Sequence, residues 1–190
     1  MTAEKLTLGT PEAITPCSFK PASRIEVRQC APEDWAGLRF STTDTGCRVE
    51  FPLEQGAHVF GFGLQLHRLD FTGGKAVLRS NADALSPSGD SHAPVPFFVT
   101  SRGCGVYIDT ARQAAVYCGY RRKSGGKSAA AREVAVSTDE LYAAREVAED
   151  AVIVIDIPGA KGVELYRFQG ASVGEAVAGY NLFSGGGAMP

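Results

Sequence analysis

The chain has 190 residues, with 19 basic and 21 acidic side chains, a net charge of −2 and 44% apolar residues. This balance does not indicate the basic face that nucleic-acid binding requires. No apolar run approaches the roughly 20 residues that a membrane-spanning helix needs. The N-terminal stretch lacks a basic segment followed by an apolar one, so we expect no secretory signal. The length is sufficient for one sizeable hydrophobic core, and we expect neither a nucleic-acid nor a membrane partner.

The cysteines are odd in number, and no two of them have the C-x-x-C spacing that often marks a metal or redox site. They are Cys17, Cys30, Cys47, Cys104 and Cys118. We expect reduced, buried or half-buried thiols and no metal site. Together with the absence of a secretory signal, this predicts a reducing, cytoplasmic location.

Residues 1–23 contain three prolines and little periodicity, which predicts an irregular lead-in with room for one edge strand. From residue 24 onward, apolar and polar residues alternate in short runs, the pattern of strands with one buried face. The runs are Arg24–Cys30, Leu38–Thr42, Gly46–Phe51, Val59–Phe62, Ala76–Leu78, Pro96–Thr100, Gly105–Asp109, Ala114–Gly119, Arg132–Val136, Ala151–Ile157 and Gly162–Phe168.

Glycine-rich turns separate these runs at residues 72–74, 86–89, 102–103 and 124–126. Glycine reaches backbone angles that other residues adopt only at a cost, so such clusters are typical of tight turns. Closely spaced strands with few helices between them favour antiparallel pairing. We therefore expect an all-β, two-sheet sandwich over residues 24–170.

Two segments depart from the strand pattern. Residues 138–149 fit either a helix or two strands joined by a turn. Ser172–Leu182 predicts a helix, because Ser172 is a suitable N-cap and Glu175 follows at the spacing of a capping box. Ser184–Gly187 then has the composition of a mobile linker. Residues 171–190 are accordingly interpreted as a helix and a linker that leads out of the sandwich.

Several familiar motifs are incomplete in this chain. The run at 124–128 ends like a phosphate-binding loop, but that loop requires a glycine where Arg121 stands. Gly61 and Gly63 lack the third glycine of a dinucleotide fingerprint, because Leu66 occupies its place. No serine lies in a G-x-S-x-G nucleophile turn. We expect no cofactor.

The segment from Ser80 to Asp90 is unusually polar and includes Asn81 and Asp83. A carboxylate can accept hydrogen bonds from two hydroxyl groups, which suits it to sugar recognition. The same residue types also stabilise turns for local reasons, so a purely structural loop is an alternative. The neighbouring aromatic residues fit either stacking on a sugar ring or filling the core. They are Phe71, Phe97 and Phe98.

Three segments occur in an order that is typical of one enzyme family. They are Phe60–Gly63 (FGFG), Asn81–Asp83 (NAD) and Pro96–Val106 (PFFVTSRGCGV). Over residues 45–190 the chain resembles the N-terminal, galactose-mutarotase-like β-sandwich domain of glycoside hydrolase family 31, a family of retaining α-glucosidases and α-xylosidases. In that family a (β/α)8 barrel follows the sandwich and carries both catalytic carboxylates.

The resemblance implies that Asp83 contacts an α-glucoside or α-xyloside near the cleavage point, while Asn81 supports the loop. It also implies that the chain is non-catalytic, packs against the barrel of a parent glycosidase and is inactive alone. Leu64, Ser80 and Cys104 replace the family's usual glutamate, tryptophan and tyrosine. Arg102 is expected to stabilise its turn through hydrogen bonds or an ion pair.

Two other functions fit the sequence. A free-standing carbohydrate-binding module would use the same Asp83 loop. An aldose-epimerase-like enzyme would need an acid and a base, and His67 and His92 are the histidines near the polar loop. Assembly into a homo-oligomer is left open.

Overall fold

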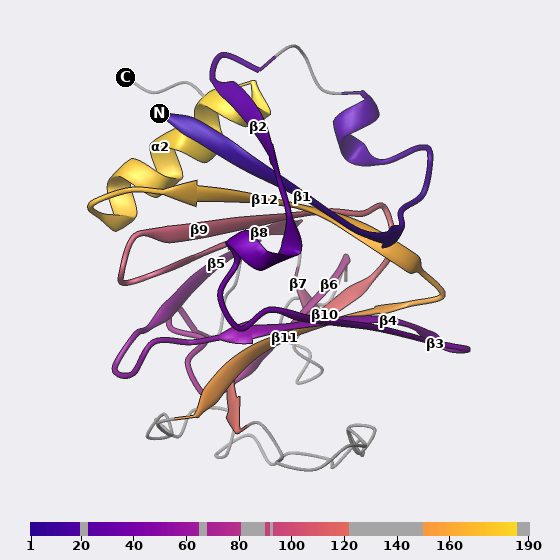
Figure 1. Cartoon of the computed structure of the whole chain (residues 1–190). Helices are drawn as coiled ribbons and strands as arrows, with labels where there is room; N and C mark the ends of the chain where they lie inside the picture. Colours follow the sequence, from indigo (N-terminus) through magenta and orange to yellow (C-terminus); the bar gives the residue numbers. More distant parts are fainter. Residues whose placement is uncertain (20–22, 65–67, 81–89, 92, 122–149, 186–190) are drawn as a thin grey trace.

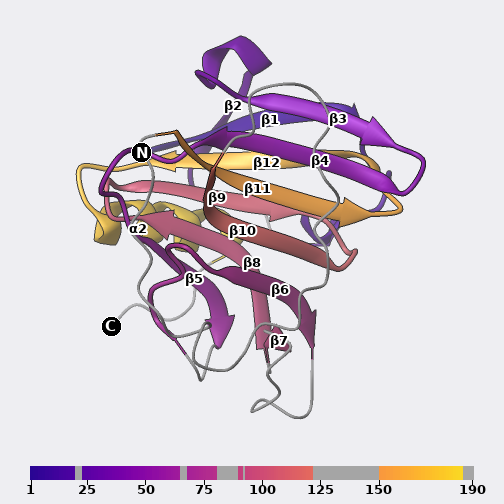
Figure 2. The same ribbon diagram turned by 90° about the horizontal axis from the view of Figure 1, so that it is seen from below.

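The computed structural model describes residues 1–19, 23–64, 68–80, 90–91, 93–121 and 150–185. These residues form two six-stranded sheets that pack face to face, with one α-helix on the outside (Figures 1 and 2). In the described part of the chain, all strand pairs are antiparallel except β1–β2 and β6–β7. The expected all-β sandwich is therefore confirmed.

We call the first sheet sheet A. Its strands, in spatial order, are β2 (Glu26–Cys30), β1 (Thr2–Thr10), β12 (Lys161–Gln169), β9 (Cys104–Asp109), β8 (Ala93–Thr100) and β5 (Val59–Leu64). We call the second sheet sheet B. Its strands are β3 (Arg39–Thr43), β4 (Gly46–Pro52), β11 (Ala151–Pro158), β10 (Ala114–Arg121), β6 (Lys75–Ser80) and β7 (Asp90–Ser91).

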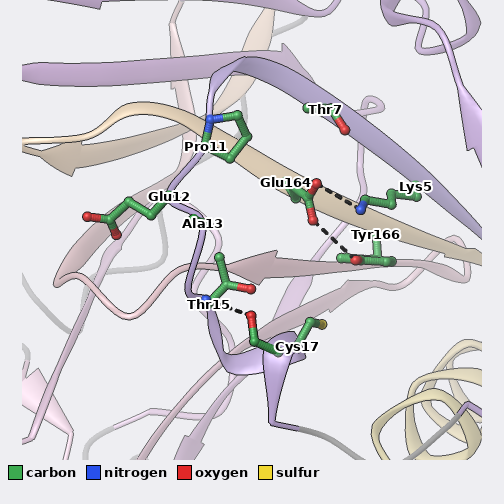
Figure 3. Close-up of a pocket in the computed structure, with 10 residues that line it drawn as sticks. Lys5, Thr7, Pro11, Glu12, Ala13, Thr15, Cys17, Glu164 and Tyr166 are labelled. Atoms are coloured by element: carbon green, nitrogen blue, oxygen red, sulfur yellow. Dashed lines mark hydrogen bonds and ion pairs between the residues drawn. The ribbon is translucent and has the colours of Figure 1, made fainter.

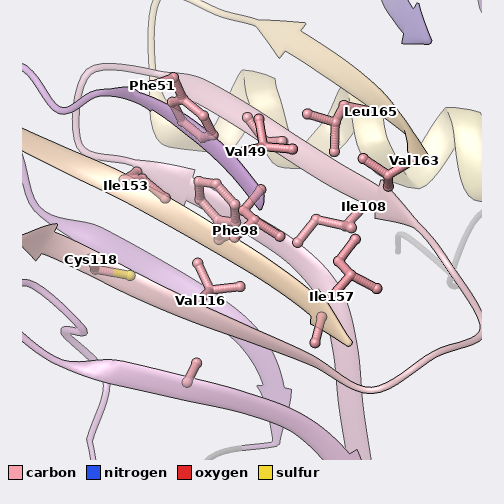
Figure 4. Packing of buried hydrophobic residues seen from close by; sticks show 14 of the residues in the cluster. Val49, Phe51, Phe98, Ile108, Val116, Cys118, Ile153, Ile157, Val163 and Leu165 are labelled. Carbon is pink, nitrogen blue, oxygen red and sulfur yellow. The ribbon is translucent and has the colours of Figure 1, made fainter. Parts of the chain in front are cut away.

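The core between the sheets consists of the inward-facing side chains of both (Figure 4). Ile153, Ile155 and Ile157 alternate along β11 and all belong to this core, as the period of two predicts for residues on one face of a strand. Phe98 from sheet A is fully buried and stacks against Phe51 of sheet B at 6.0 Å between ring centroids. These contacts join the two sheets.

A second apolar cluster lies on the outer face of sheet A, beneath helix α2 (Val173–Ser184). Phe183 of the helix is 1% exposed and lies against Tyr166 of β12, at 4.6 Å between ring centroids. Ser172 caps the helix by accepting the Glu175 N–H at 3.2 Å, as the sequence predicted. No helix among the described residues is long and apolar enough to cross a membrane.

Strand β1 corrects one expectation, because the sequence predicted an irregular lead-in with room for one edge strand. Thr2–Thr10 instead form a nine-residue strand between β2 and β12, in the interior of sheet A. Ala3, Leu6 and Leu8 are buried. Their spacing interrupts the simple alternation, since Ala3 faces the helix side and Leu6 faces the other sheet. The prolines that follow the strand, at residues 11 and 16, reinforced the mistaken expectation.

The strands predicted at 24–30, 38–42, 46–51 and the later described runs are present, with shifts of one to two residues at their ends in most cases. The sequence also missed β7, a two-residue strand paired with β6. The predicted strand at Arg132–Val136 and the segment 138–149 lie outside the described residues, as does the linker beyond Gly185.

Candidate functional site

The two residues that the sequence selected for sugar contact, Asn81 and Asp83, lie outside the described residues. The structure does describe the strands on either side of them. Ser80 ends β6 and pairs with Ser91 of β7, so the two ends of the 81–89 segment lie side by side at one edge of sheet B.

The end of the glycine motif reaches the same corner of the sandwich (Figure 2). Gly63 and Leu64 of β5 pair with Pro94 and Ala93, which follow directly after β7. The register shifts between Gly61 and Gly63, which marks a β-bulge. The end of the FGFG motif thus lies beside Ala93 and Pro94, about 30 residues later in the chain, although sequence spacing alone did not show it.

Within this bulge, the backbone of Phe62 adopts the left-handed conformation. Phe62 has φ 67° and is fully buried, against Phe71 at 5.0 Å and Phe98 at 5.4 Å between ring centroids. Such a conformation is costly for a non-glycine residue, by about 1–3 kcal/mol, and persists only where packing enforces it. The bulge therefore turns the Phe62 side chain into the core between the sheets.

The three aromatic residues near the polar loop are core residues. Phe71, Phe97 and Phe98 are 3%, 6% and 0% exposed. Side chains this deeply buried have no face available for a sugar ring. Of the two alternatives that the sequence left open for them, core packing is the correct one.

His58 is the one histidine that the described part of the chain contains, since His67 and His92 fall outside it. Its Nδ1 lies 2.6 Å from Oδ2 of Asp70, whose other oxygen accepts the Thr72 N–H at 2.9 Å. Burial raises the pKa of Asp70, but the Thr72 and His58 hydrogen bonds outweigh it and lower that pKa overall. The pair joins the start of β5 to the turn before β6, which is a structural role.

Arg102 lies at the β8–β9 turn and contacts the chain segment at 54–55. Its Nη2 donates to the Gln55 carbonyl at 3.4 Å, and its Nε lies 3.9 Å from Oε2 of Glu54. These contacts agree with the expected turn-stabilising role.

The cysteines form no disulfide, and three of the five are buried. Burial raises the pKa of Cys104 to about 11 and that of Cys47 to about 11, so both thiols remain protonated at neutral pH. The described residues contain no group of three or more potential metal ligands.

A pocket of about 450 Å³ lies on the outer face of sheet A, beyond the end of α2 (Figure 3). Its floor is made by β1 and β12, with Lys5, Glu164 and Tyr166 at its centre. Its wall is residues 11–18, which turn back over the sheet and include the short 3-10 helix η1 (Pro16–Ser18). Sequence analysis did not identify this pocket, because its floor and wall come from opposite ends of the chain.

The wall is attached to the sheet through a buried carboxylate. Asp109, at the end of β9, is 1% exposed and accepts hydrogen bonds from the Thr15 hydroxyl at 2.6 Å and the Cys17 N–H at 3.0 Å. The Tyr107 hydroxyl is 3.4 Å away. A carboxylate is buried at low cost only when its oxygens are paired in this way. The wall therefore has a defined position.

No family of known sequences matches the chain, and no curated protein does. Solved structures match it. A glycoside hydrolase family 31 dextranase from Flavobacterium johnsoniae, complexed with glucose, matches with TM-score 0.56 and 16% identity, over 82% of this chain and 16% of that chain. A mutant of that dextranase complexed with isomaltotriose matches with TM-score 0.56 and 17% identity over the same shares.

A cycloalternan-degrading enzyme from Trueperella pyogenes matches with TM-score 0.46 and 18% identity, over 74% of this chain and 17% of that chain. At these identities, the dextranase comparison shows a shared fold. The chain has the β-sandwich fold of a segment that makes up 16% of the dextranase. The fold that the sequence motifs implied is thereby confirmed.

Proposed function

We propose that this chain is a non-catalytic β-sandwich domain of a retaining α-glycosidase, which packs against a catalytic barrel and extends a substrate-contacting loop that contains Asp83. The observation that carries the proposal is the match of nearly the whole sandwich, 82% of this chain, to a small share of a dextranase. The matched dextranase structures contain glucose and isomaltotriose. An α-glucoside is therefore the first sugar class to test, followed by an α-xyloside.

The arrangement of β5, β6, β7 and β8 supports the proposed role of the Asp83 loop. The pairing of Ser80 with Ser91 brings the loop ends together, and the bulge at Gly61–Gly63 places a second segment beside them. In the proposal, Asp83 accepts hydrogen bonds from sugar hydroxyls, while Asn81 supports the loop. Positioning a substrate in this way contributes to rate without supplying the reacting groups.

Apolar surface beside α2 supports packing against a further domain. Leu182 is 37% exposed on the helix, and Met1, whose sulfur lies close to Gly179 of the helix, is 56% exposed. Exposed apolar side chains on or beside one element are a feature of interaction surfaces. In the proposal this surface faces the barrel.

The carboxylates of the described residues support a non-catalytic role. Retaining glycosidases use two carboxyl groups about 5–5.5 Å apart, one as nucleophile and one as proton donor. Here many acids are instead paired with bases or buried in hydrogen bonds. The ion pairs are Glu4–Arg167, Glu12–Arg112, Asp156–Arg48 and Glu164–Lys5. The proposal also includes a reducing, cytoplasmic location, which the disulfide-free cysteines support.

The test is made on the polypeptide expressed from the complete reading frame, with nitrophenyl α-glucoside and α-xyloside as substrates. Asp83→Ala should lower kcat/KM by about tenfold or more, since a hydrogen bond to a charged group is lost. Asp44→Ala, in the β3–β4 turn at the opposite edge of sheet B, is the matched control and should leave kcat/KM unchanged. Equal kcat/KM values for both variants, or no hydrolysis by the complete polypeptide, would contradict the proposal.

A free-standing carbohydrate-binding module remains the second candidate and gives a different result. If the 190-residue chain alone binds isomaltose in a calorimetric titration, Asp83→Ala abolishes that binding and no barrel is encoded with it, the module is the better description.

A further inference from the structure

The pocket on the outer face of sheet A is separate from the Asp83 loop. It lies over β1 and β12, whereas the loop ends lie beside β5, three strands further along sheet A and on the far edge of sheet B. A ligand in the pocket would therefore be a second one. The inference below does not depend on the proposed function.

The pocket is preformed by contacts that hold its wall at several points. Asp109 holds Thr15 and the Cys17 N–H, and Arg112 forms an ion pair with Glu12 at 2.7 Å. Within the wall, the Thr15 N–H donates to the Ser18 hydroxyl at 3.1 Å. A wall ordered before binding reduces the entropy lost when a ligand binds. The pocket has a volume of about 450 Å³ and opens widely to solvent, so a ligand would be held by its floor and wall rather than enclosed.

The floor of the pocket offers both donors and acceptors at one place. The Lys5 ammonium lies 2.8 Å from Oε1 of Glu164, and the Tyr166 hydroxyl lies 3.4 Å from the other carboxylate oxygen. Burial raises the pKa of Tyr166, so its hydroxyl keeps its proton at neutral pH. Thr7 is exposed on the same face, two residues from Lys5 along β1 and directly opposite Glu164 of β12.

The charged groups on the floor have more hydrogen-bond donors and acceptors than their contacts with each other occupy. An ammonium has three donors and a carboxylate about four acceptor positions, and among the described residues Lys5 and Glu164 use only a minority of them. Both side chains are reachable, with 27% and 20% of their surfaces exposed. We propose that this pocket binds a small, neutral, polyhydroxylated molecule, whose hydroxyl groups accept from Lys5 and donate to Glu164.

A charged ligand fits this floor less well. An anion would compete with Glu164 for the ammonium, and a cation would compete with Lys5 for the carboxylate, so either would disrupt an ion pair whose charges already balance. A hydroxyl group donates and accepts, so it can bind both members of the pair while the pair stays intact. Charge balance on the floor thus favours a polyol over an acid or an amine.

The experiment titrates the isotopically labelled 190-residue protein with D-glucose and with sorbitol, and follows the backbone amide resonances. Saturable shifts are expected at residues 5–7, 12–17 and 164–166, with a Kd on the order of millimolar. Glu164→Gln should weaken binding about tenfold, the loss expected for one hydrogen bond to a charged group. Thr7→Val, a milder change at an exposed position, should weaken it about threefold.

Asp156→Asn is the matched control. Asp156 also forms a cross-strand ion pair, with Arg48, and is similarly exposed at 24%, but it lies on sheet B. This variant should bind as the unmodified protein does, and so should Asp83→Ala, which separates the pocket from the Asp83 loop. The proposal is overturned by the absence of saturable shifts at these amides, by equal affinity of Glu164→Gln, or by tighter binding of glycine or succinate than of glucose.

Discussion

The cluster between the two sheets and the cluster beneath α2 are built from different kinds of side chain. The inter-sheet cluster consists of buried apolar residues such as Ile155, Phe98 and Leu165. The outer cluster is rich in tyrosine and borders the buried carboxylate of Asp109. The first requires only shape and burial, whereas the second also requires specific hydrogen bonds.

This difference assigns the two clusters different tasks. Apolar burial is non-directional, so the inter-sheet cluster stabilises the sandwich as a whole. Hydrogen bonds to a buried acid are directional, so the outer cluster determines where residues 11–18 and the pocket lie. The tasks can be separated by substitutions that affect one cluster and spare the other.

The largest effect is expected from Phe98→Ala in the inter-sheet cluster. Phe98 is fully buried and stacks on rings from both sheets, so its removal should lower the free energy of unfolding by about 3–5 kcal/mol. Denaturant titration measures this. Leu69→Ala, at a position 79% exposed, should change the free energy by less than about 0.5 kcal/mol, and a similar loss in both variants would contradict the assignment.

Asp109→Ala should have the next largest effect and should act on the outer cluster. It leaves the Thr15 and Tyr107 hydroxyls without their acceptor, at a cost of about 2–3 kcal/mol. Hydrogen exchange should become much faster at the Cys17 amide and stay slow along β11. Uniform acceleration in both places would mean that Asp109 supports the whole sandwich rather than the wall.

Gly63→Ala tests the inter-sheet cluster at β5, the strand whose bulge turns Phe62 into that cluster. Gly63 has φ 84°, and an added Cβ would lie 2.2 Å from the Ala93 carbonyl, so we expect a loss of about 2 kcal/mol or more. In α2, a Cβ added at Gly174 would meet only the Ser172 hydroxyl oxygen, at an ordinary contact distance of 3.8 Å, so Gly174→Ala should stabilise by about 0.5–1 kcal/mol. Thermal unfolding of the two variants measures the expected loss and the expected gain of stability. An unchanged stability of Gly63→Ala would contradict the close approach of Gly63 to the Ala93 carbonyl.

A smaller, pH-dependent effect is expected at Glu4, which contacts Arg167 and Arg28 at 2.6 Å each. Burial raises the pKa of Glu4, but the hydrogen bonds to both guanidinium groups outweigh it and lower that pKa overall. Because the pKa of Glu4 is lower in the folded state, its carboxylate stabilises the fold at pH values above the unfolded-state pKa. This stabilisation is lost as the pH falls through the folded-state pKa.

Glu4→Gln should therefore cost about 1 kcal/mol at pH 7, and the cost should become smaller as the pH falls from 7 to 3. Denaturant titrations at the two pH values test this, with Glu26→Gln at an exposed position of β2 as the control. A cost that stays constant with pH would show that packing, rather than the ion pairs, is responsible.

Sequence patterns predicted the parts of this protein whose physical cause is local. The short apolar run Ala151–Ile157 predicted a strand because its pattern lies within a few neighbouring residues. Ser172 predicted a helix start because its cap bond spans three residues. Strand β1 was missed because its buried positions change faces. Asp109 was missed because Thr15 and Cys17 lie more than 90 residues away, and nothing near Asp109 indicates them.

The Asp83 loop was predicted from the sequence alone, whereas the pocket was found from the structure alone. Motif order around Asn81 and Asp83 predicted a sugar-contacting loop through a resemblance, and the described residues place the ends of that loop together without describing the loop itself. The pocket over β1 and β12 arose from the structure alone, since Lys5 and Glu164 are paired only after the chain has closed its sheet.

The most direct test of the central claim is an assay of glycoside hydrolysis by the purified 190-residue chain. Nitrophenyl α-glucoside and isomaltose are incubated with the protein, and released nitrophenol and glucose are measured. Our account predicts no release above the rate without protein, because the two reacting carboxylates are expected in another domain. Turnover that copurifies with the chain through successive columns, and that a single acid-to-amide substitution within it eliminates, would contradict the account.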